Sequence, residues 1–330
     1  MQKSNIEWTD YTSNPIKYRE RATGKVVWGC VKVSGGCGHC YAEDLAKRYG
    51  KGGPFTVGRM AELEPFVSEA ELKALLSVKK LQAGSKVFVG DMTDIFGAWV
   101  PFEMLVRLFA VFARRPDVIF QLLTKRPERM REFIGDLMRG TPSVAVLKEA
   151  GLDELRWPLP NVWLGTSVED QPAADKRIPE LLATPAVVRY LSCEPLLGPV
   201  TLPREPSVSY GSCSENGRAL GIEGRLHWVI VGGESGPKAR PFDVAWGRSL
   251  HWQCASAGVA FFMKQYGSKP VDGRFSNDPA DGFGKRIKLR HAHGGDIAEF
   301  PEDLRVREWP GAASAVVPSS EFREASGVGS

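Results

Sequence analysis

Three cysteines lie within eleven residues near the start of the chain and form the strongest chemical signal in the sequence. They are Cys30, Cys37 and Cys40. Glycines stand between them, and glycine adopts positive φ at little cost, so this loop can turn tightly. Three thiolates suit three corners of an iron–sulfur cube and leave its fourth iron open. They also suit zinc, with His39 or a distant residue as fourth ligand, or a structural metal cluster without chemistry.

Polar and charged side chains also follow a series of short apolar, β-branched stretches. They are Gly90, Asp91 and Asp94; Thr124, Lys125 and Arg126; Thr166, Ser167 and Glu169; Ser192 and Glu194; Glu234 and Ser235; and Lys264 and Gln265. Helix capping explains Asp, Ser and Thr at such positions, because these are ordinary N-cap residues. It does not explain Glu194, Glu234 and Lys264. We therefore expect a polar ring around the mouth of an active site.

A strand followed by a helix recurs along the chain. The expected strands are Val26–Trp28, Val87–Gly90, Val118–Leu123, Val162–Gly165, Val187–Leu191, Trp228–Val231 and Val259–Met263. The expected helices are Tyr41–Tyr49, Glu69–Leu81, Phe102–Ala113, Pro127–Met138, Ala173–Ala183 and Ala245–Ala257. Near-continuous apolar strands that alternate with amphipathic helices predict an α/β fold with a parallel sheet covered by helices. We expect a parallel β/α barrel, partial or nearly complete, in which the carboxyl ends of the strands converge on one mouth.

Two segments interrupt this pattern. Residues 201–227 are rich in Ser, Gly, Pro and charge, and we expect them to form an inserted excursion that serves as a lid. Residues 311–330 are expected to form a flexible tail. The remainder predicts a single catalytic domain over residues 1–310.

The composition is that of a globular protein. Hydrophobic residues make up 43% and charged residues 25% of the 330 positions. We see neither a secretory signal nor an apolar run of the roughly 18 residues that a membrane span needs. We therefore expect a cytoplasmic protein with reduced thiols, whose six cysteines are metal ligands or free thiols rather than disulfides. The net charge of +4 permits an anionic partner without requiring one.

The cysteine loop resembles the signature of the radical S-adenosylmethionine (SAM) superfamily. In that signature an aromatic residue precedes the third cysteine, and His39 holds this place; six residues rather than three separate the first two cysteines. More specifically, the chain resembles a phage- and bacteria-associated family of uncharacterised three-cysteine, radical-SAM-like proteins. The matching segments are Ile6–Asp10, Gly29–Glu43, Val89–Phe96, Leu123–Pro127, Leu164–Glu169, Leu191–Leu196, Val231–Pro237 and Phe262–Tyr266.

This resemblance implies two cofactors, a [4Fe–4S] cluster held by the three cysteines and SAM chelating the open iron. It implies that Asp91 accepts a hydrogen bond from the SAM amino group and that Gly90 allows close backbone approach. The other expected SAM-binding residues are Thr124 and Lys125, with Arg126 as an alternative to Lys125 for the SAM carboxylate, and Thr166, Ser167 and Glu169 for the ribose. The residues expected to act on the substrate are Cys193, Glu194, Glu234 and Lys264.

The resemblance further implies that a one-electron donor such as flavodoxin or ferredoxin reduces the cluster. SAM is then cleaved to methionine and a 5′-deoxyadenosyl radical, which removes hydrogen from the substrate. The favoured substrate is a modified, thymine-derived base in phage DNA within the host cytoplasm, and the favoured reaction is an isomerisation. Candidate phosphate contacts are Lys285, Arg286, Lys288 and Arg290, although solvated surface also explains this basic run.

Three alternatives stay open at this point. One is a DNA-repair lyase similar to spore photoproduct lyases, with Cys193 as its hydrogen donor. Another is a zinc-stabilised nucleic-acid-binding protein without catalysis, which has no need of carboxylates around a mouth. A third is a phosphate cradle formed by the glycines of residues 231–236, which lack the Lys and Ser/Thr that complete a P-loop.

Overall fold

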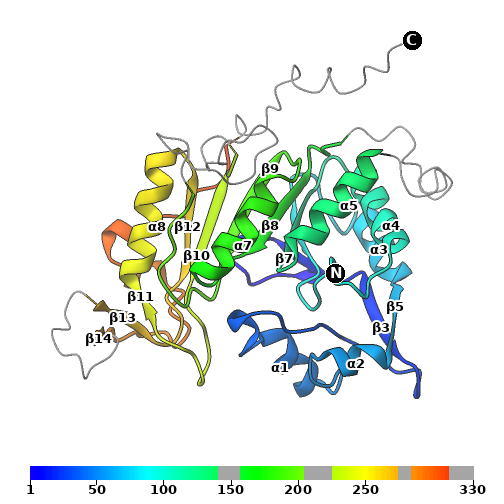
Figure 1. Ribbon diagram of the computed structural model, residues 1–330, viewed down its shortest axis with the longest axis horizontal. Coiled ribbons are helices and arrows are strands. Elements are labelled where there is room, and N and C mark those ends of the chain that lie inside the picture. Colours follow the sequence, from blue (N-terminus) through cyan, green and yellow to red (C-terminus); the bar gives the residue numbers. More distant parts are fainter. Residues whose placement is uncertain (140–156, 204–224, 274–283, 312–330) are drawn as a thin grey trace, which may run out of the picture.

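The computed structural model describes residues 1–139, 157–203, 225–273 and 284–311 (Figure 1). Its centre is an eight-stranded sheet with the order β1-β2-β6-β7-β8-β9-β10-β12. These strands are β1 (Gln2–Lys3), β2 (Tyr11–Ser13), β6 (Lys86–Val89), β7 (Ile119–Thr124), β8 (Val162–Ser167), β9 (Val188–Cys193), β10 (Trp228–Gly232) and β12 (Ala260–Gln265). Only β1 runs antiparallel to its neighbour within this sheet. The fold is therefore mixed α/β with a large, mostly parallel sheet.

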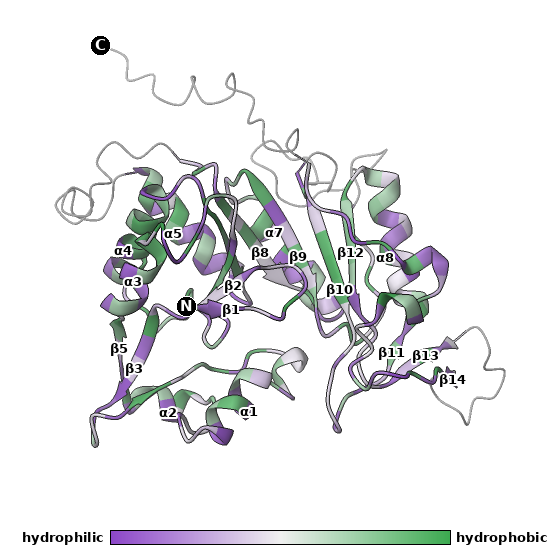
Figure 2. Cartoon of the chain, turned by 180° about the vertical axis from the view of Figure 1, so that it is seen from behind, coloured by the Kyte–Doolittle hydropathy of each residue, from purple (hydrophilic) through white to green (hydrophobic). Residues whose placement is uncertain are grey.

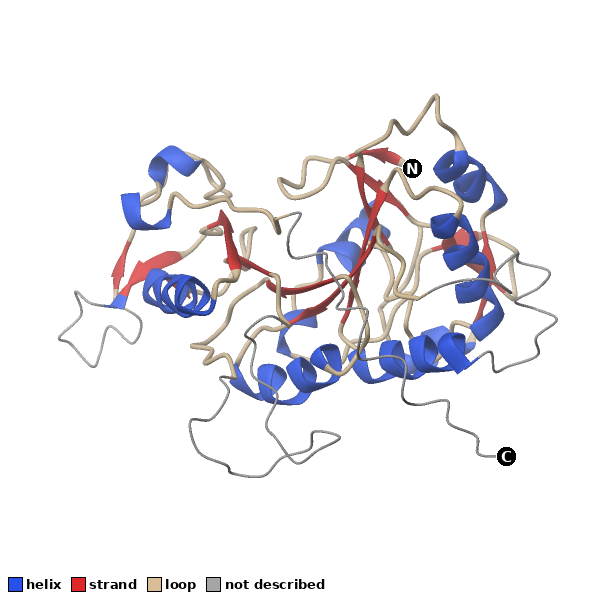
Figure 3. Ribbon diagram, turned by 90° about the horizontal axis from the view of Figure 1, so that it is seen from above, coloured by secondary structure: helices blue, strands red, loops and turns tan. Residues whose placement is uncertain are grey.

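Helices cover one face of this sheet. They are α3 (Glu69–Leu76), α4 (Phe102–Ala113), α5 (Pro127–Arg139), α7 (Gln171–Leu182) and α8 (Val244–Ala257). The parallel strands follow one another in sequence order, so right-handed crossovers place successive helices on the same face. Figure 3 shows these helices along one side of the curved row of strands. Hydrophobic residues run along the strands and the inner sides of the helices (Figure 2).

The opposite face of the sheet carries a separate aromatic core. Trp8, from the segment between β1 and β2, lies with its ring centroid 4.9 Å from Phe88 and 6.4 Å from both Tyr190 and Trp228. Trp228 is the first residue of β10, so this core fills the sheet's inner face near the amino ends of the strands. The carboxyl ends are left as the place where a cavity can form.

The two edges of the sheet remain separate. On one edge β1 pairs with β2, and on the other the chain near residue 307 runs antiparallel to β12, with Met263 N donating to Val306 O at 2.8 Å. Within the described residues β1 and β12 do not pair, so the sheet is open. In the described residues the sheet therefore does not close into a barrel.

Most of the expected elements are confirmed, but the first expected strand is wrong in its role. Val26–Val27 forms β4 in a separate antiparallel sheet with β3 (Ile16–Glu20) and β5 (Leu63–Val67), inserted between β2 and β6. The strand that starts the parallel sheet is β2, whose Tyr-Thr-Ser sequence has no apolar run to reveal it. The cysteine loop therefore follows the small sheet and leads into α1 (Tyr41–Arg48) and α2 (Val57–Ala61).

The remaining elements extend the far edge of the molecule. A third sheet joins β11 (Phe242–Asp243), β13 (Pro270–Asp272) and β14 (Lys285–Arg286). The expected insert at 201–227 and tail at 311–330 fall almost wholly outside the described residues. In the part of the chain that the structure describes, no helix has the length and apolarity to cross a membrane.

Candidate functional site

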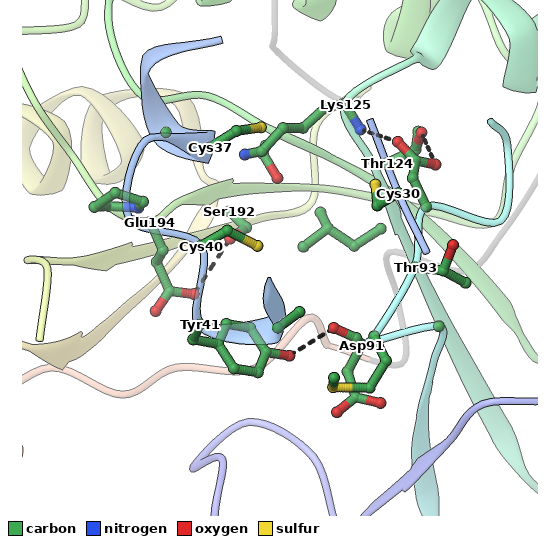
Figure 4. A pocket seen from close by; sticks show the side chains of 18 of the residues that line it. Cys30, Cys37, Cys40, Tyr41, Asp91, Thr93, Thr124, Lys125, Ser192 and Glu194 are labelled. Carbon is green, nitrogen blue, oxygen red and sulfur yellow. Dashed lines mark hydrogen bonds between the residues drawn. The ribbon is translucent and has the colours of Figure 1, made fainter. Parts of the chain in front are cut away.

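A cavity of about 450 Å³ lies at the carboxyl edge of the parallel sheet, beneath the cysteine loop (Figure 4). This volume is typical of small-molecule sites. The three loop cysteines and thirteen residues of the expected polar ring line it: Cys30, Cys37, Cys40, Gly90, Asp91, Asp94, Thr124, Lys125, Arg126, Ser167, Ser192, Glu194, Glu234, Ser235, Lys264 and Gln265. The structure therefore brings together side chains that are up to 235 positions apart, from Cys30 to Gln265.

The three cysteines border this cavity as free thiols. Cys40 is the N-cap residue of α1 and makes no side-chain cap hydrogen bond. Burial raises the pKa of the Cys40 thiol, with the backbone N–H groups of Glu43 and Ala42 at the start of the helix opposing this shift, and burial also raises the pKa of Cys30 to about 12. Ionising these thiols therefore calls for a cation beside them, which is what a metal supplies.

Glu169 anchors one side of the cysteine loop. Its side chain is fully buried and accepts a hydrogen bond from Ser34 Oγ at 2.7 Å. Gly36 lies so close that an added Cβ would come within 2.4 Å of the carboxylate. Lys125 Nζ lies at 2.6 Å and Arg177 at 2.8 Å. Burial alone would raise the pKa of Glu169, but these two cations lower it to about 2.

Glu234 anchors the other side of the loop. Its carboxylate pairs with Arg240 at 2.6 Å and lies 3.1 Å from His39 Nδ1. Arg240 also donates to the carbonyl oxygen of Gly35 at 2.8 Å. Burial opposes ionisation, yet the hydrogen bonds from Arg240 and His39 lower the pKa of Glu234 to about 2. Glu234 lines the cavity, but its polar atoms are engaged in holding the loop.

Two further bonds tie the start of the loop to the sheet. Thr93 donates to the carbonyl oxygen of Gly29 at 2.7 Å, and Arg126 donates to that of Val31 at 2.9 Å. Arg126 also pairs with Asp94 at 2.9 Å, so its guanidinium is already neutralised. Lys125 and Arg126, the two candidates for binding the SAM carboxylate, are thus both paired with carboxylates of the protein itself.

Asp91 presents a carboxylate to the cavity with little neutralising charge around it. Asn14 donates to its side chain at 2.6 Å, and Tyr41 donates to its carbonyl oxygen at 2.8 Å. Gly90, just before it, has φ of +88°, a conformation that side chains disfavour. Burial raises the pKa of Asp91 above its usual value, with Asn14 opposing. A carboxylate in this setting is stabilised by a ligand that brings a positive charge.

The opposite wall of the cavity carries a half-buried ion pair. Lys264 Nζ lies 2.9 Å from Glu194 Oε1, and Ser192 donates to the other carboxylate oxygen at 3.3 Å. Burial would lower the pKa of Lys264, but Glu194 raises it, so the lysine stays charged. Trp8 and Phe88 form an apolar floor beside this pair. The cavity can therefore take a ring on its floor and hydrogen-bond to the edge of that ring.

Three expected site residues do not line the cavity. Thr166 donates to the carbonyl oxygen of Thr124 within the sheet, and Glu169 lies behind the loop. Cys193 belongs to the core between sheet and helices, and its burial raises the pKa of its thiol well above the usual value. Ser192 and Glu194 line the cavity, and alternation along a strand turns Cys193 to the opposite face. This placement does not suit the hydrogen-donor role expected for Cys193.

The structure also reveals site residues that the sequence analysis missed, namely Asn14, Tyr41, Arg177 and Arg240. Asn14 and Tyr41 are 77 and 50 positions away from Asp91, whereas Arg177 and Arg240 follow Glu169 and Glu234 by eight and six positions. Tyr41 directly follows the third cysteine, which is a signal that sequence inspection could have used. The other three carry no comparable local signal.

The expected phosphate contacts lie outside the cavity. Lys285 and Arg286 form the exposed strand β14, and Lys288 is exposed as well. Arg290 has its Nε 3.6 Å from Glu299. Strand β14 pairs with β13 in the third sheet, at the far edge of the molecule (Figure 1).

Comparison with known proteins gives one match. The family model described as a protein of unknown function (DUF5131) matches residues 3–301. The chain belongs to this family. No curated protein and no solved structure matches it. The matched residues include the cysteine loop, the parallel strands of the main sheet and the residues that line the cavity.

The Glu169 anchor yields a stability prediction. We expect Glu169→Gln to lower the free energy of unfolding by about 3 kcal/mol, because it leaves the buried Arg177 and the half-buried Lys125 without their carboxylate. Since the folded pKa of about 2 lies below the ordinary 4.5, this contribution is present above about pH 4.5 and is lost as the pH falls toward 2. Denaturant unfolding at pH 7 and at low pH measures both effects.

The matched control is Glu180→Gln, which removes a carboxylate from a partly exposed pair with Arg131. That pair is expected to contribute less than about 1 kcal/mol. Equal losses for the two variants at pH 7 would contradict the anchoring role of Glu169.

Proposed function

We propose that this chain is a radical SAM enzyme that binds a [4Fe–4S] cluster through Cys30, Cys37 and Cys40. The observation that carries the proposal is the placement of three free cysteines of one loop around a single cavity at the carboxyl edge of a parallel sheet. This is the edge at which β/α folds bind their ligands. We further propose that the open sheet is the partial barrel of that superfamily.

The choice of a cube over a single zinc ion rests on the resemblance of the cysteine loop to the radical SAM signature. Three thiolates on one loop suit three irons of a cube and leave the fourth iron open to a ligand. The cavity of about 450 Å³ that the three thiols border has the volume of a small-molecule site.

The chain's own residues would then bind and orient SAM. When bound, the cluster and SAM together supply a carbon radical that removes hydrogen from an unactivated carbon. Asp91 accepts the SAM ammonium, and Gly90 lets the backbone approach it. Ser167 is the cavity-lining candidate for the ribose. Lys125 and Arg126 act instead on the loop and its anchors, because both are paired with carboxylates.

For the substrate we propose a modified, thymine-derived base carried on phage DNA, with isomerisation of its side group. The apolar floor of Trp8 and Phe88 suits a flat ring, and Lys264 with Glu194 offers a donor and an acceptor to its edge. A base must leave the stack to reach this cavity. The proposed phosphate contacts that hold the strand meanwhile are the exposed side chains of Lys285, Arg286, Lys288 and Arg290.

The cluster is tested by removing its ligands. Anaerobically reconstituted protein is expected to hold about four irons per chain, whereas replacing any of the three loop cysteines by Ala removes the cluster. Cys193→Ala is the matched control, because that thiol lies in the core away from the cavity. Iron and sulfide analysis with visible spectroscopy measures the outcome. Stoichiometric zinc without iron would overturn the proposal.

The SAM site is tested at Asp91. We expect Asp91→Asn to weaken SAM binding about tenfold to hundredfold, since hydrogen bonds to charged groups contribute about 1.5–3 kcal/mol. The charged carboxylate is the form that binds an ammonium, so wild-type affinity falls as the pH drops through the raised pKa of Asp91, and the variant lacks this dependence. Calorimetric titration over pH measures it, with the exposed Asp44→Asn as control. Unchanged affinity in Asp91→Asn would mean that Asp91 does not bind SAM.

The substrate is tested with the basic run. Replacing Lys285, Arg286, Lys288 and Arg290 by Gln is expected to weaken DNA binding and to reduce its log–log salt slope by about 0.9 for each lost phosphate contact. Incubating modified phage DNA with enzyme, SAM and reductant, then digesting it for chromatography and mass spectrometry, detects the product. Isomerisation changes retention at constant mass. If the protein does not bind DNA at low salt and no nucleoside is altered, DNA is excluded as the substrate.

A further inference from the structure

Trp99 lies in the segment between β6 and α4 and does not line the cavity, but its indole contacts two polar side chains. Its Nε1 donates to the hydroxyl oxygen of Tyr18 at 2.8 Å. The guanidinium of Arg126 lies 4.6 Å from the centre of the indole ring, which is the geometry of a cation–π contact. None of the functions proposed above uses Trp99 or Tyr18.

The first of these contacts starts a hydrogen-bond chain that runs to the cysteine loop. Tyr18 on β3 is fully buried, and its hydroxyl oxygen lies 2.8 Å from Thr93 Oγ1. Thr93 donates to the carbonyl oxygen of Gly29 at 2.7 Å, and a hydroxyl has only one proton to donate. Tyr18 is therefore the donor to Thr93, while it accepts from Trp99. The chain has a single direction, from the Trp99 indole to the backbone just before Cys30.

The second contact reaches the backbone on the other side of Cys30. Arg126 donates from Nη2 to the carbonyl oxygen of Val31 at 2.9 Å, and its Nη1 pairs with Asp94 at 2.9 Å. The indole face of Trp99 therefore supports a guanidinium whose two terminal nitrogens both have partners. Trp99 is thus connected to both of the carbonyl groups that flank Cys30.

The other two cysteines of the loop are held differently. Cys37 directly follows the stretch that Glu169 and Arg240 anchor, and Cys40 is the N-cap residue of α1. Cys30 lies seven positions before Cys37, so its backbone is held instead by the groups connected to the indole. Groups outside the first shell of a metal commonly orient its ligands, and losing one typically costs about 10- to 100-fold in metal affinity.

We propose that Trp99 is a positioning residue for Cys30, the first of the three cysteines that would hold the cluster. This inference rests on the proposed function. Through Tyr18 and Thr93 the indole fixes the backbone before Cys30, and through Arg126 it fixes the backbone after it. The thiol therefore keeps one direction before a cluster binds, which reduces the entropy lost when the ligand is ordered.

Two conservative variants of the full chain test this role. Trp99→Phe removes the indole N–H but keeps an aromatic ring against Arg126, and Tyr18→Phe breaks the chain at the hydroxyl. In reconstituted protein we expect both variants to lose iron to a chelator about tenfold faster than wild type. We also expect the electron paramagnetic resonance spectrum of the reduced cluster to change, because it depends on the geometry of the thiolate ligands. Absorbance follows the iron release.

The matched controls lose the same chemical groups elsewhere. Trp157→Phe removes an indole that donates to the carbonyl oxygen of Pro185 at 2.8 Å, near the start of β8. Tyr190→Phe removes a buried hydroxyl that donates to the carbonyl oxygen of Leu122 at 3.0 Å. Both controls are expected to keep the iron release and the spectrum of wild type. If Trp157→Phe speeds iron release as much as Trp99→Phe does, the positioning role is wrong.

A measurement on the protein without metal separates this role from the cluster itself. Iodoacetamide is added under anaerobic conditions, and peptide mass spectrometry follows each cysteine. We expect alkylation of Cys30 to rise about fivefold in Trp99→Phe, as the loss of one hydrogen bond predicts, and that of the core thiol Cys193 to stay unchanged. An equal rise at both thiols would mean general loosening and would overturn the proposal. Wild type that binds no iron–sulfur cluster would overturn the proposed function instead, and alkylation of Cys30 would then still decide whether Trp99 holds this thiol.

Discussion

The pairing of Glu169 is the interaction on which the rest of the site depends. A fully buried carboxylate needs cations and hydrogen bonds around it, because its desolvation is otherwise far too costly. Lys125 at the end of β7, Arg177 on α7 and Ser34 of the cysteine loop together meet that need. The carboxylate thus joins the sheet, its helix layer and the loop at one point. The position of the cysteines over the cavity follows from this junction.

The site separates carboxylates that hold the structure from those that face a ligand. Glu169 and Glu234 have pKa values of about 2 and stay charged near neutral pH, so they serve as anchors rather than as proton donors. Burial raises the pKa of Asp91, and the hydrogen bond to its side chain comes from a neutral amide, that of Asn14. Carboxylates therefore take two roles in this site, and local charge decides which.

The aromatic side chains that pack on the inner face of the sheet determine where a ligand can enter. The aromatic core around Trp8 occupies the amino half of this face, and Trp309 extends it, with its ring centroid 4.9 Å from Trp228. Apolar packing closes that end, whereas the carboxyl end is bordered by the cysteine loop and polar side chains. This arrangement leaves the cavity at the carboxyl end of the sheet, next to the cysteine loop.

The sequence by itself determined the order of the strands from β6 to β12 in the main sheet and of the helices between them, the basic run and the grouping of three cysteines, because these depend on local periodicity and spacing. It also indicated that Asp91, Glu194 and Lys264 lie where their strands end. Only the tertiary structure decided that Cys193 faces the helices, since one position along a strand reverses a side chain's direction. Likewise, the structure alone turned Glu169 and Glu234 from expected ligand contacts into anchors. Ser34 is 135 positions away from Glu169, and such a contact leaves no trace in local sequence pattern. Arg177 and Arg240 follow their carboxylates by only eight and six positions, but the direction in which these side chains turn depends on the fold.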